Sequence, residues 1–376
     1  MRAGASNGHR GAGVAATPGS LFSLVRLLIL ASERPVSMPS RPRVAKRTMA
    51  EALVGSPAME WLLKLPSLWR GVLVLAYHRI QESDQETPFD SGVFSATPST
   101  FEAQLRFLTR HFQVVSPESI KRNPDSLGRR VVVTFDDGYR DNYELAFPLL
   151  REYGMPATFF LATGFLDNPR VPWWDELAWM VRRSPRRVLE DREWFGGRLL
   201  LDGDRRPAID ELTRTYKSLP TERTEAFLDF CADAAGTGRC DASAGADLWM
   251  TWEMAAELRD AGMTIGGHTA THPVLGRARP EVQSREVEEC ARRLREKLGV
   301  SIRFFAYPVG LIESFDDSTR RILREAGVEL AFSLYGGYLR PGRLDPYDVP
   351  RASVGRGTSP SGFRAMLTFP RLFARW

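Results

Sequence analysis

The chain has 376 residues, 43% of them hydrophobic and 26% charged, and a formal net charge of +5. This length and apolar content predict a globular protein with one large α/β domain, and they exclude disorder over most of the chain. Basic residues are mixed with acidic ones, and no recognition helix or stacking-aromatic motif occurs, so nucleic acid is excluded as an expected partner.

The first 70 residues differ in composition from the rest. Residues 1 to about 47 are rich in Gly, Ala, Ser, Pro and Arg, which bury too little apolar surface to offset the entropy of ordering the chain. We expect residues 1–70 to be a disordered tail or to precede the true start, for which Met38, Met49 and Met59 are candidates. The apolar segment 21–31 is shorter than the ~20 residues of a membrane-spanning helix and lacks a clear cleavage site. A cytoplasmic or membrane-associated location is favoured over secretion, and no motif supports binding to a membrane surface.

A domain of alternating strands and helices is expected from residue 71 to residue 360. Seven apolar runs have the length of a strand. Most are continuous, which is typical of a parallel sheet covered on both faces. They lie at 72–77, 131–135, 157–161, 263–266, 304–307, 330–333 and 347–349.

Helical patterns separate most of these runs. Apolar residues recur every three or four positions at 100–112, 142–153, 281–298 and 318–326, as in amphipathic helices. Glycines 154, 299 and 327 follow three of these segments, where a glycine commonly ends a helix. The β-α-β-α order predicts a distorted (β/α)7-type barrel. Segment 169–249 interrupts it and is predicted to be a polar, helical insertion rather than a second core, and 361–376 to be a C-terminal tail.

The three cysteines give no sign of a disulfide or a metal site. Cys231, Cys240 and Cys290 cannot all pair within the chain, and none lies in a C-x-x-C arrangement. We therefore expect three buried or unreactive thiols.

Two adjacent carboxylates follow the predicted strand 131–135. Asp136 and Asp137 lie within Thr134-Phe135-Asp136-Asp137-Gly138-Tyr139, at the carboxyl end of a parallel strand, where α/β folds place their sites. Neighbouring side chains point in different directions, so one carboxylate can bind a metal ion while the other acts as a base on water. The alternative interpretation is a solvated turn, in which Asp and Gly are common.

Two histidines four residues apart follow the predicted strand 263–266. His268 and His272 lie within His268-Thr269-Ala270-Thr271-His272-Pro273, a spacing that brings two side chains to one side of a helical turn. Two histidines and one carboxylate can hold a divalent ion and leave positions open for water and substrate. A zincin metalloprotease also has histidines four apart, but it needs a glutamate where Thr269 stands.

Together these segments resemble the first two motifs of the polysaccharide deacetylases, carbohydrate esterase family 4. The resemblance rests on T-F-D-D-G-Y at 134–139 and H-T-A-T-H-P at 268–273, and it extends over about residues 73–354. It implies a metal-dependent hydrolase that removes N-acetyl groups from an amino sugar. Residue by residue, it implies Asp136 as the catalytic base and Asp137, His268 and His272 as metal ligands. Residues 305–310 resemble the third motif, which implies that the main-chain N–H of Val309 holds the oxyanion.

Two departures from the family pattern change the expected site. Many members have an arginine that orients the base where Ala306 stands. Arg351 resembles the arginine of a sub-group and is our candidate for this role. Most members also have a general-acid histidine near the C-terminus, but none follows His272 in this chain. In a sub-group acting on poly-N-acetylglucosamine the histidine precedes the first motif, and His78 in Tyr77-His78-Arg79 is similar to it, so His78 is the expected general acid.

Four aromatic residues are candidates for substrate binding, because pyranose faces stack on aromatic rings: Tyr139, Trp173, Trp174 and Tyr307. Tryptophans of this kind are also common in protein cores. Asp175 lies in the same stretch as the tryptophans, and we assign it no specific role.

The sequence therefore predicts metal-dependent hydrolysis of N-acetyl groups from an amino-sugar polymer or glycan precursor, giving acetate and a free amine. Zinc is the expected ion, and cobalt, nickel and iron are chemically compatible. Two alternatives stay open: an amidase acting on a non-sugar C–N bond, and a non-catalytic carbohydrate-binding protein on the same barrel. Loss of a ligand or of the base would indicate the second, and none is lost. The carbohydrate is the only partner that the sequence predicts, and it does not define an oligomeric state.

Overall fold

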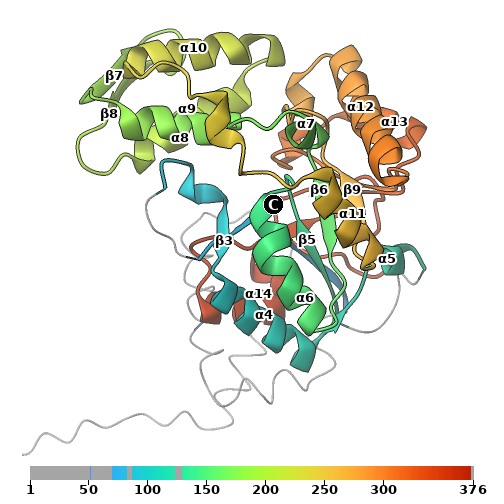
Figure 1. The fold of residues 1–376 in the computed structure, drawn as a ribbon. Coiled ribbons are helices and arrows are strands. Elements are labelled where there is room, and N and C mark those ends of the chain that lie inside the picture. Colours follow the sequence, from blue (N-terminus) through green and yellow to red (C-terminus); the bar gives the residue numbers. More distant parts are fainter. Residues whose placement is uncertain (1–50, 52–69, 83–86, 123–128, 374–376) are drawn as a thin grey trace, which may run out of the picture.

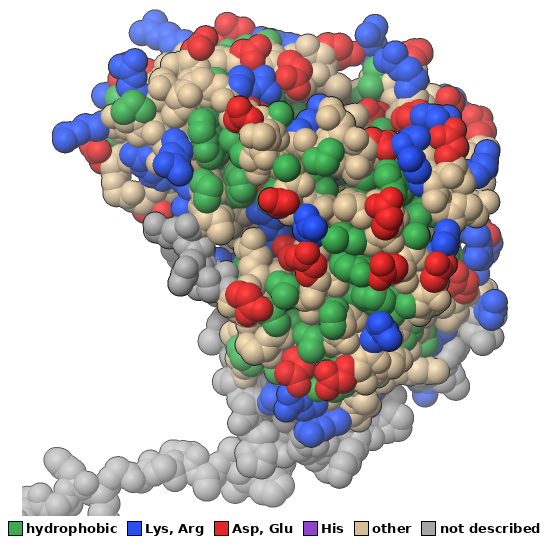
Figure 2. Space-filling model, viewed as in Figure 1, with side chains coloured by type: hydrophobic (Ala, Val, Ile, Leu, Met, Phe, Trp, Pro, Cys, Tyr) green, Lys and Arg blue, Asp and Glu red, His purple; other side chains and the backbone are tan. Residues whose placement is uncertain are grey.

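The computed structural model describes residue 51 and residues 70–82, 87–122 and 129–373. The expected disorder of the N-terminal tail, including segment 21–31, lies outside these residues. Within the described ranges, no helix is both long enough and apolar enough to cross a membrane. Acidic and basic side chains are interspersed on the face shown in Figure 2, as the mixed sequence predicts.

Seven parallel strands form the barrel. Their order around the sheet is β11 (Leu330–Phe332), β10 (Phe304–Ala306), β9 (Thr264–Gly267), β6 (Thr158–Leu161), β5 (Arg129–Phe135), β1 (Gly71–Tyr77) and β12 (Arg351–Ser353). The chain closes the barrel just before β12, because Val349 pairs in parallel with Phe332 of β11, while β12 pairs with β1. The predicted (β/α)7-type barrel is confirmed.

The last strand begins later than expected. The sequence places it at 347–349, but only Val349 forms a bridge there, and the regular strand starts at Arg351. Pro350 lies between them and has no N–H to donate, so it interrupts the pairing. Because of this shift, the regular strand begins with Arg351, whose side chain is completely buried.

Both faces of the barrel strands are buried, which explains their continuous apolar runs. In β1, Val72 and Val74 belong to the cluster inside the barrel, whereas Leu73 and Leu75 belong to the cluster under the outer helices. Successive side chains of a strand point to opposite faces. A strand covered on both sides is therefore apolar at most positions.

Helices cover the outer face of the barrel (Figure 1). They include α4 (Pro98–His111), α6 (Phe147–Glu152), α11 (Trp252–Asp260), α12 (Pro280–Leu298), α13 (Asp317–Glu325) and α14 (Pro360–Thr368). The predicted helix 142–153 begins instead with a π-helical turn, η2 (Asn142–Ala146). Gly299 ends α12 in the left-handed conformation, with φ of 66°, as its position predicts.

The insertion has secondary structure and apolar packing that the sequence did not predict. Besides α8 (Trp173–Arg183), α9 (Arg206–Ser218) and α10 (Thr224–Ala235) it contains an antiparallel hairpin of β7 (Val188–Asp191) and β8 (Gly197–Leu200). Its amphipathic helices bury their apolar faces against one another in a separate cluster, which reaches Tyr139 and Phe165 of the barrel. The insertion is thus helical, as the sequence predicts, and it has a hairpin and a cluster of buried apolar residues in addition.

Candidate active site

The two adjacent aspartates point to different partners at the end of β5. The N–H of Asp136 still pairs with the carbonyl of Tyr77 on β1. Asp137 then adopts a left-handed φ of 74°, so its carboxylate turns towards the loop after β9. Both side chains are almost completely buried, with exposures of 1% and 2%. A solvated turn, the alternative interpretation, is therefore wrong.

Asp137, His268 and His272 form a compact group. The Nε2 atoms of His268 and His272 lie 3.2 Å and 3.3 Å from Oδ1 of Asp137. The expected helical turn between the histidines is absent. Instead, Thr269 and His272 have φ angles of 65° and 63°, and the His272 N–H donates to the Thr269 hydroxyl at 2.9 Å. A loop rather than a helix brings the two imidazoles together.

The polar atoms of this group fit a cation. Nδ1 of His268 faces the carbonyl oxygen of Ala306 at 2.7 Å. A carbonyl can only accept, so Nδ1 carries the proton and Nε2 presents its lone pair to Asp137. Burial lowers the pKa of His272 to about 3, which favours the neutral, metal-binding imidazole. Oδ1 of Asp137 is buried and has no hydrogen-bond partner in the described part of the chain. The three ligand atoms lie within 4.8 Å of one another, and a divalent ion between them would satisfy them.

Asp136 is held by Arg351 of β12. The guanidinium donates from Nη1 to Oδ1 at 2.6 Å and from Nη2 to Oδ2 at 2.8 Å, and Arg351 itself is completely buried. Burial acts to raise the pKa of Asp136, but the charge and hydrogen bonds of Arg351, together with the charges of His268 and His78, lower it below its usual range. Ala306, where many family members have arginine, is buried in β10. Arg351 thus contacts the candidate base, as expected of the residue that the sequence predicts to replace the arginine missing at position 306.

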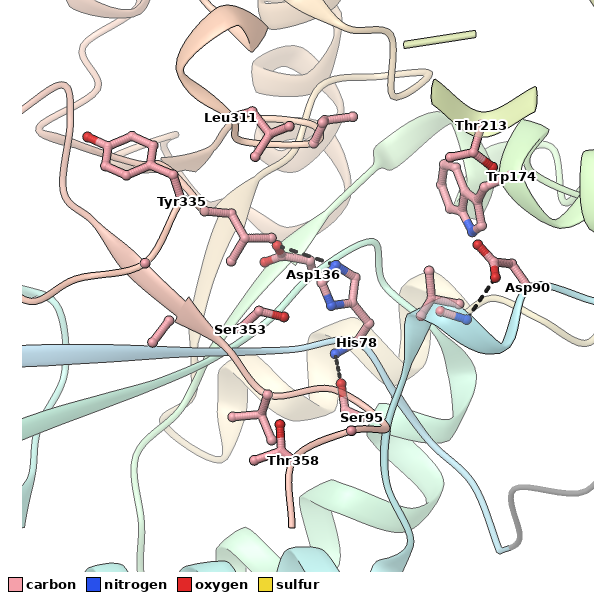
Figure 3. A pocket seen from close by; sticks show the side chains of 18 of the residues that line it. His78, Asp90, Ser95, Asp136, Trp174, Thr213, Leu311, Tyr335, Ser353 and Thr358 are labelled. Atoms are coloured by element: carbon pink, nitrogen blue, oxygen red, sulfur yellow. Dashed lines mark hydrogen bonds and ion pairs between the residues drawn. The ribbon is translucent and has the colours of Figure 1, made fainter. Parts of the chain in front are cut away.

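His78 lies on the other side of Asp136, directly after β1. Its Nε2 atom is 4.0 Å from Oδ2 of Asp136, and 19% of its side chain is exposed. Its backbone is fixed at both ends, because the N–H donates to the Ser95 hydroxyl at 2.9 Å and the carbonyl accepts from Asn142 at 2.6 Å. Figure 3 shows the imidazole facing Asp136 inside the pocket.

Val309 lies in the loop after β10 with a φ of 64°, a region that β-branched residues rarely adopt. Gly310 follows, and a side chain there would collide with Leu334. Within the described residues, the Val309 N–H has no hydrogen-bond partner. Val309 also lines the pocket beside the candidate metal ligands. Its N–H is therefore a hydrogen-bond donor without a partner close to those residues.

Apart from the buried Arg351, these residues line one groove with a volume of about 810 Å³. Helix α9 of the insertion contributes to its lining, together with the loops after β1, β5, β9 and β10. In Figure 3, Asp90 and Thr213 lie on the same side as Trp174, opposite Leu311 and Tyr335. The insertion is therefore part of the site and not a peripheral addition.

The prediction that Tyr139 contacts a sugar is not supported, because its side chain has no exposed surface. Its ring stacks on Trp249 with the centroids 4.9 Å apart, and its hydroxyl accepts a hydrogen bond from Trp174 at 2.9 Å. Tyr139 joins the barrel to the insertion.

The other three aromatic candidates border the groove but are mostly packed. Trp174 is 4% exposed and lies edge-on to His272, with the ring centroids 4.6 Å apart. Trp173 stacks on Tyr216 at 4.0 Å. Tyr307 stacks on Phe315 at 3.9 Å. They shape the wall of the groove and leave little ring face for stacking on a sugar.

The family model described as polysaccharide deacetylase matches residues 123–186 and 211–331. These ranges include the aspartates after β5 and the histidines after β9. The chain belongs to the polysaccharide deacetylase family. The membership predicted from the two motifs is confirmed, and the unmatched segment 187–210 contains the β7–β8 hairpin.

Relatives of this chain match over part of their length. The Bacillus subtilis protein YxkH is 26% identical over 160 residues, which are 38% of this chain and 52% of YxkH. A poly-β-1,6-N-acetyl-D-glucosamine N-deacetylase of Staphylococcus epidermidis is 32% identical over 108 residues, covering 26% of this chain and 37% of that protein. The matches span about half or less of these relatives.

Solved structures share the fold of the family. The Streptococcus pyogenes deacetylase PplD, in complex with acetate, aligns with a TM-score of 0.51 and 19% identity over 78% of this chain and 96% of that one. A de-N-acetylase of Aggregatibacter actinomycetemcomitans aligns with a TM-score of 0.50 and 16% identity over 78% and 98%. At these identities the likeness extends to the fold alone.

One contributor to the candidate site gave no signal in the sequence. Glu286 of α12 accepts from the N–H groups of Ala270 and Thr271 at 3.0 Å and 2.8 Å, and from the Thr271 hydroxyl at 2.7 Å. It thereby fixes the loop between the two histidine ligands. Asp175, which had no role, forms a buried ion pair with Arg79 at 2.9 Å, next to His78.

The cysteine prediction is confirmed for all three thiols, which are free. Cys231 and Cys290 are buried, and Cys240 is partly buried.

Proposed function

We propose that this protein hydrolyses N-acetyl groups of an N-acetylated amino-sugar polymer or glycan precursor, giving acetate and a free amine, with a divalent metal ion bound by Asp137, His268 and His272. One observation carries the proposal. The buried ligand group lies beside a base held by Arg351, and His78 lies on the other side of that base. The names of the relatives, which include N-deacetylases of poly-β-1,6-N-acetyl-D-glucosamine, agree with it.

Zinc is the ion that we propose. Two imidazole nitrogens and one carboxylate oxygen are a usual zinc ligand set that leaves a position open for chemistry. When bound, such an ion polarises a carbonyl group and lowers the pKa of water towards ~7.

The residues around the ion divide the proton transfers between them. Asp136, kept ionised and oriented by Arg351, accepts a proton from the attacking water. The free N–H of Val309 stabilises the negative charge that develops on the acetamide oxygen. His78 donates a proton to the departing nitrogen, which would otherwise leave as an unstable amide anion. The partial exposure of His78 lets it exchange protons with solvent.

The deciding experiment measures acetate release from N-acetylglucosamine oligomers and polymers. We expect release to stop on chelation and to return with zinc or cobalt. The Asp136→Asn variant should lose at least about a hundredfold in rate while still binding metal, because it removes only the base.

Two results would count against this function. Release that survives chelation and persists in Asp136→Asn would contradict the mechanism. Metal binding through His268 and His272 without acetate from any glycan would favour an amidase acting on a non-sugar substrate or a carbohydrate-binding protein.

A further inference from the structure

Helix α9 of the insertion presents one face to the groove that contains the metal ligands. The groove-lining residues of this helix are Arg206, Asp210, Thr213, Arg214 and Lys217. Arg206, Asp210, Thr213 and Lys217 are three or four positions apart, so they share one side of the helix, and Arg214 lies beside them. A substrate that extends from the metal site along the groove therefore meets this face.

Most of the charges on this wall are already paired. Arg206 binds Asp90 and Asp210, both at 2.5 Å. Arg214 is paired with Glu211 one turn earlier on the same helix. Arg206 faces two carboxylates and Arg214 faces one, so these pairs leave one net negative charge, which Lys217 balances.

Lys217 differs from the two arginines. No carboxylate in the described ranges lies within ion-pairing distance of its ammonium group. The side chain is half-buried, and its Nζ atom lies 5.8 Å from the centroid of the Trp173 ring. Burial lowers the pKa of Lys217, and the charges of Asp90 and Asp210 act in the opposite direction, so the cost of removing this ammonium from water is only partly offset. A negatively charged ligand group would offset this cost.

Two more hydrogen-bonding groups near Lys217 are unused. The Thr213 hydroxyl, one turn earlier on α9, and the indole N–H of Trp173 are buried and have no partner among the described residues. Both residues line the groove. An ammonium and an indole N–H can only donate, and a hydroxyl can donate as well. This set of donors matches the acceptor oxygens of a carboxylate or a phosphate.

We propose that the α9 wall around Lys217 is a subsite for an anionic group of the substrate, so that the glycan carries a carboxylate or phosphate on a unit other than the one being deacetylated. This inference rests on the proposed function. It deepens that function by naming the substrate class, an acidic N-acetylated glycan, and the residue that selects it.

The test compares three oligosaccharide series of equal length. One alternates glucuronate with N-acetylglucosamine, one is N-acetylglucosamine alone, and one is N-acetylglucosamine with a terminal phosphate. Their binding to the Asp136→Asn protein is measured by calorimetry, so that no turnover interferes. The same measurement is repeated on Lys217→Met, Lys217→Arg and the control Lys121→Met. Lys121 is an exposed residue paired with Glu329, away from the groove lining.

We expect at least one anionic series to bind about tenfold or more tightly than the neutral series, with the advantage shrinking as salt is added. Lys217→Met should remove most of the advantage, Lys217→Arg should keep it, and Lys121→Met should leave it unchanged. The series that gains the advantage, carboxylate or phosphate, identifies the anionic group.

Equal binding of neutral and anionic oligomers, or an advantage that survives Lys217→Met, would overturn the subsite. Acetate release by the unmodified protein decides the proposed function separately. If the protein releases acetate from neutral and acidic glycans alike, and substitution of Lys217 changes nothing, the proposed function stands and the subsite is refuted. Binding that depends on Lys217, with no acetate from any glycan, would keep the subsite and refute the function.

Discussion

Four residues other than glycine have a left-handed φ angle in the described part of the chain, and all four lie in the loops of the candidate site: Asp137, Thr269, His272 and Val309. Such a conformation costs on the order of 1–3 kcal/mol for each residue and persists only where the surroundings enforce it. Two of them, Asp137 and His272, are candidate metal ligands, and Val309 offers the free N–H. The backbone is strained where the chemistry is proposed, so packing elsewhere in the barrel must maintain the geometry of the site.

At the scale of single residues, Arg351 should be required for turnover more than for substrate binding, because it contacts the base and not the groove lining. We expect Arg351→Lys to keep the buried charge but to lose the two parallel hydrogen bonds to Asp136, lowering kcat about tenfold or more with little change in KM. Steady-state kinetics of acetate release measure this effect. The control is Arg303→Lys, an exposed arginine paired with Glu329. Full activity in Arg351→Lys would show that orientation of the base does not depend on this residue.

At the scale of secondary-structure elements, the candidate metal site is built from loops held by helices on the outside of the barrel. Helix α12 contributes Glu286 to the histidine loop. On the other side of that loop, the Gly164 N–H of α7 (Thr163–Asp167) donates to the Ala270 carbonyl at 2.8 Å. A side chain on Gly164 would collide with the same carbonyl. The helices thus support the site as well as covering the sheet.

We expect Glu286→Ala to weaken zinc binding about tenfold or more, because groups that orient metal ligands commonly have effects of this size. Equilibrium dialysis or calorimetry with zinc alone measures this without any enzymatic assay. Glu286→Gln keeps an acceptor for the loop N–H groups and should restore most of the affinity. Glu288→Ala, an exposed position on the same helix, is the matched control. Unchanged zinc affinity in Glu286→Ala would mean that the loop keeps its shape without this carboxylate.

At the scale of the whole molecule, the barrel and the insertion are joined by buried polar contacts beside the site. Arg79, directly after His78, pairs with Asp175 of α8, and both are almost completely buried. The Asp175 carboxylate also accepts from the N–H of Asp90 at 2.9 Å. The insertion therefore supports both the segment that carries His78 and the wall of the groove.

This junction should give stability a specific pH dependence. Burial raises the pKa of Asp175 to about 6, above the value of roughly 3.9 for an unfolded chain. The folded state then binds the proton more tightly. The stabilisation that the Asp175 proton contributes to the folded state is on the order of 3 kcal/mol. It is fully present below about pH 4 and is lost as the pH rises through about 6. Relative to Asp175→Asn, the unmodified protein should lose unfolding free energy over this interval. Urea denaturation at several pH values measures the difference, and a difference independent of pH would refute the raised pKa.

The sequence by itself determined the class of fold and pointed to the members of the candidate metal site. Continuous apolar runs such as 131–135 identify strands buried on both faces, and the two motifs after such runs give Asp136, Asp137, His268 and His272. These signals are local, because each depends on neighbouring residues of the chain and on where parallel strands end.

Only the tertiary structure decided which distant residues complete the site. Arg351 reaches Asp136 because β12 closes the barrel beside β1, and Glu286 reaches the histidine loop from α12. Tyr139, an exposed candidate in the sequence, is buried under the insertion. Lys217 becomes part of the groove because α9 packs as its wall. Contacts of this kind depend on how elements far apart in the chain pack together, and a linear pattern of apolar and polar residues does not encode those pairings locally.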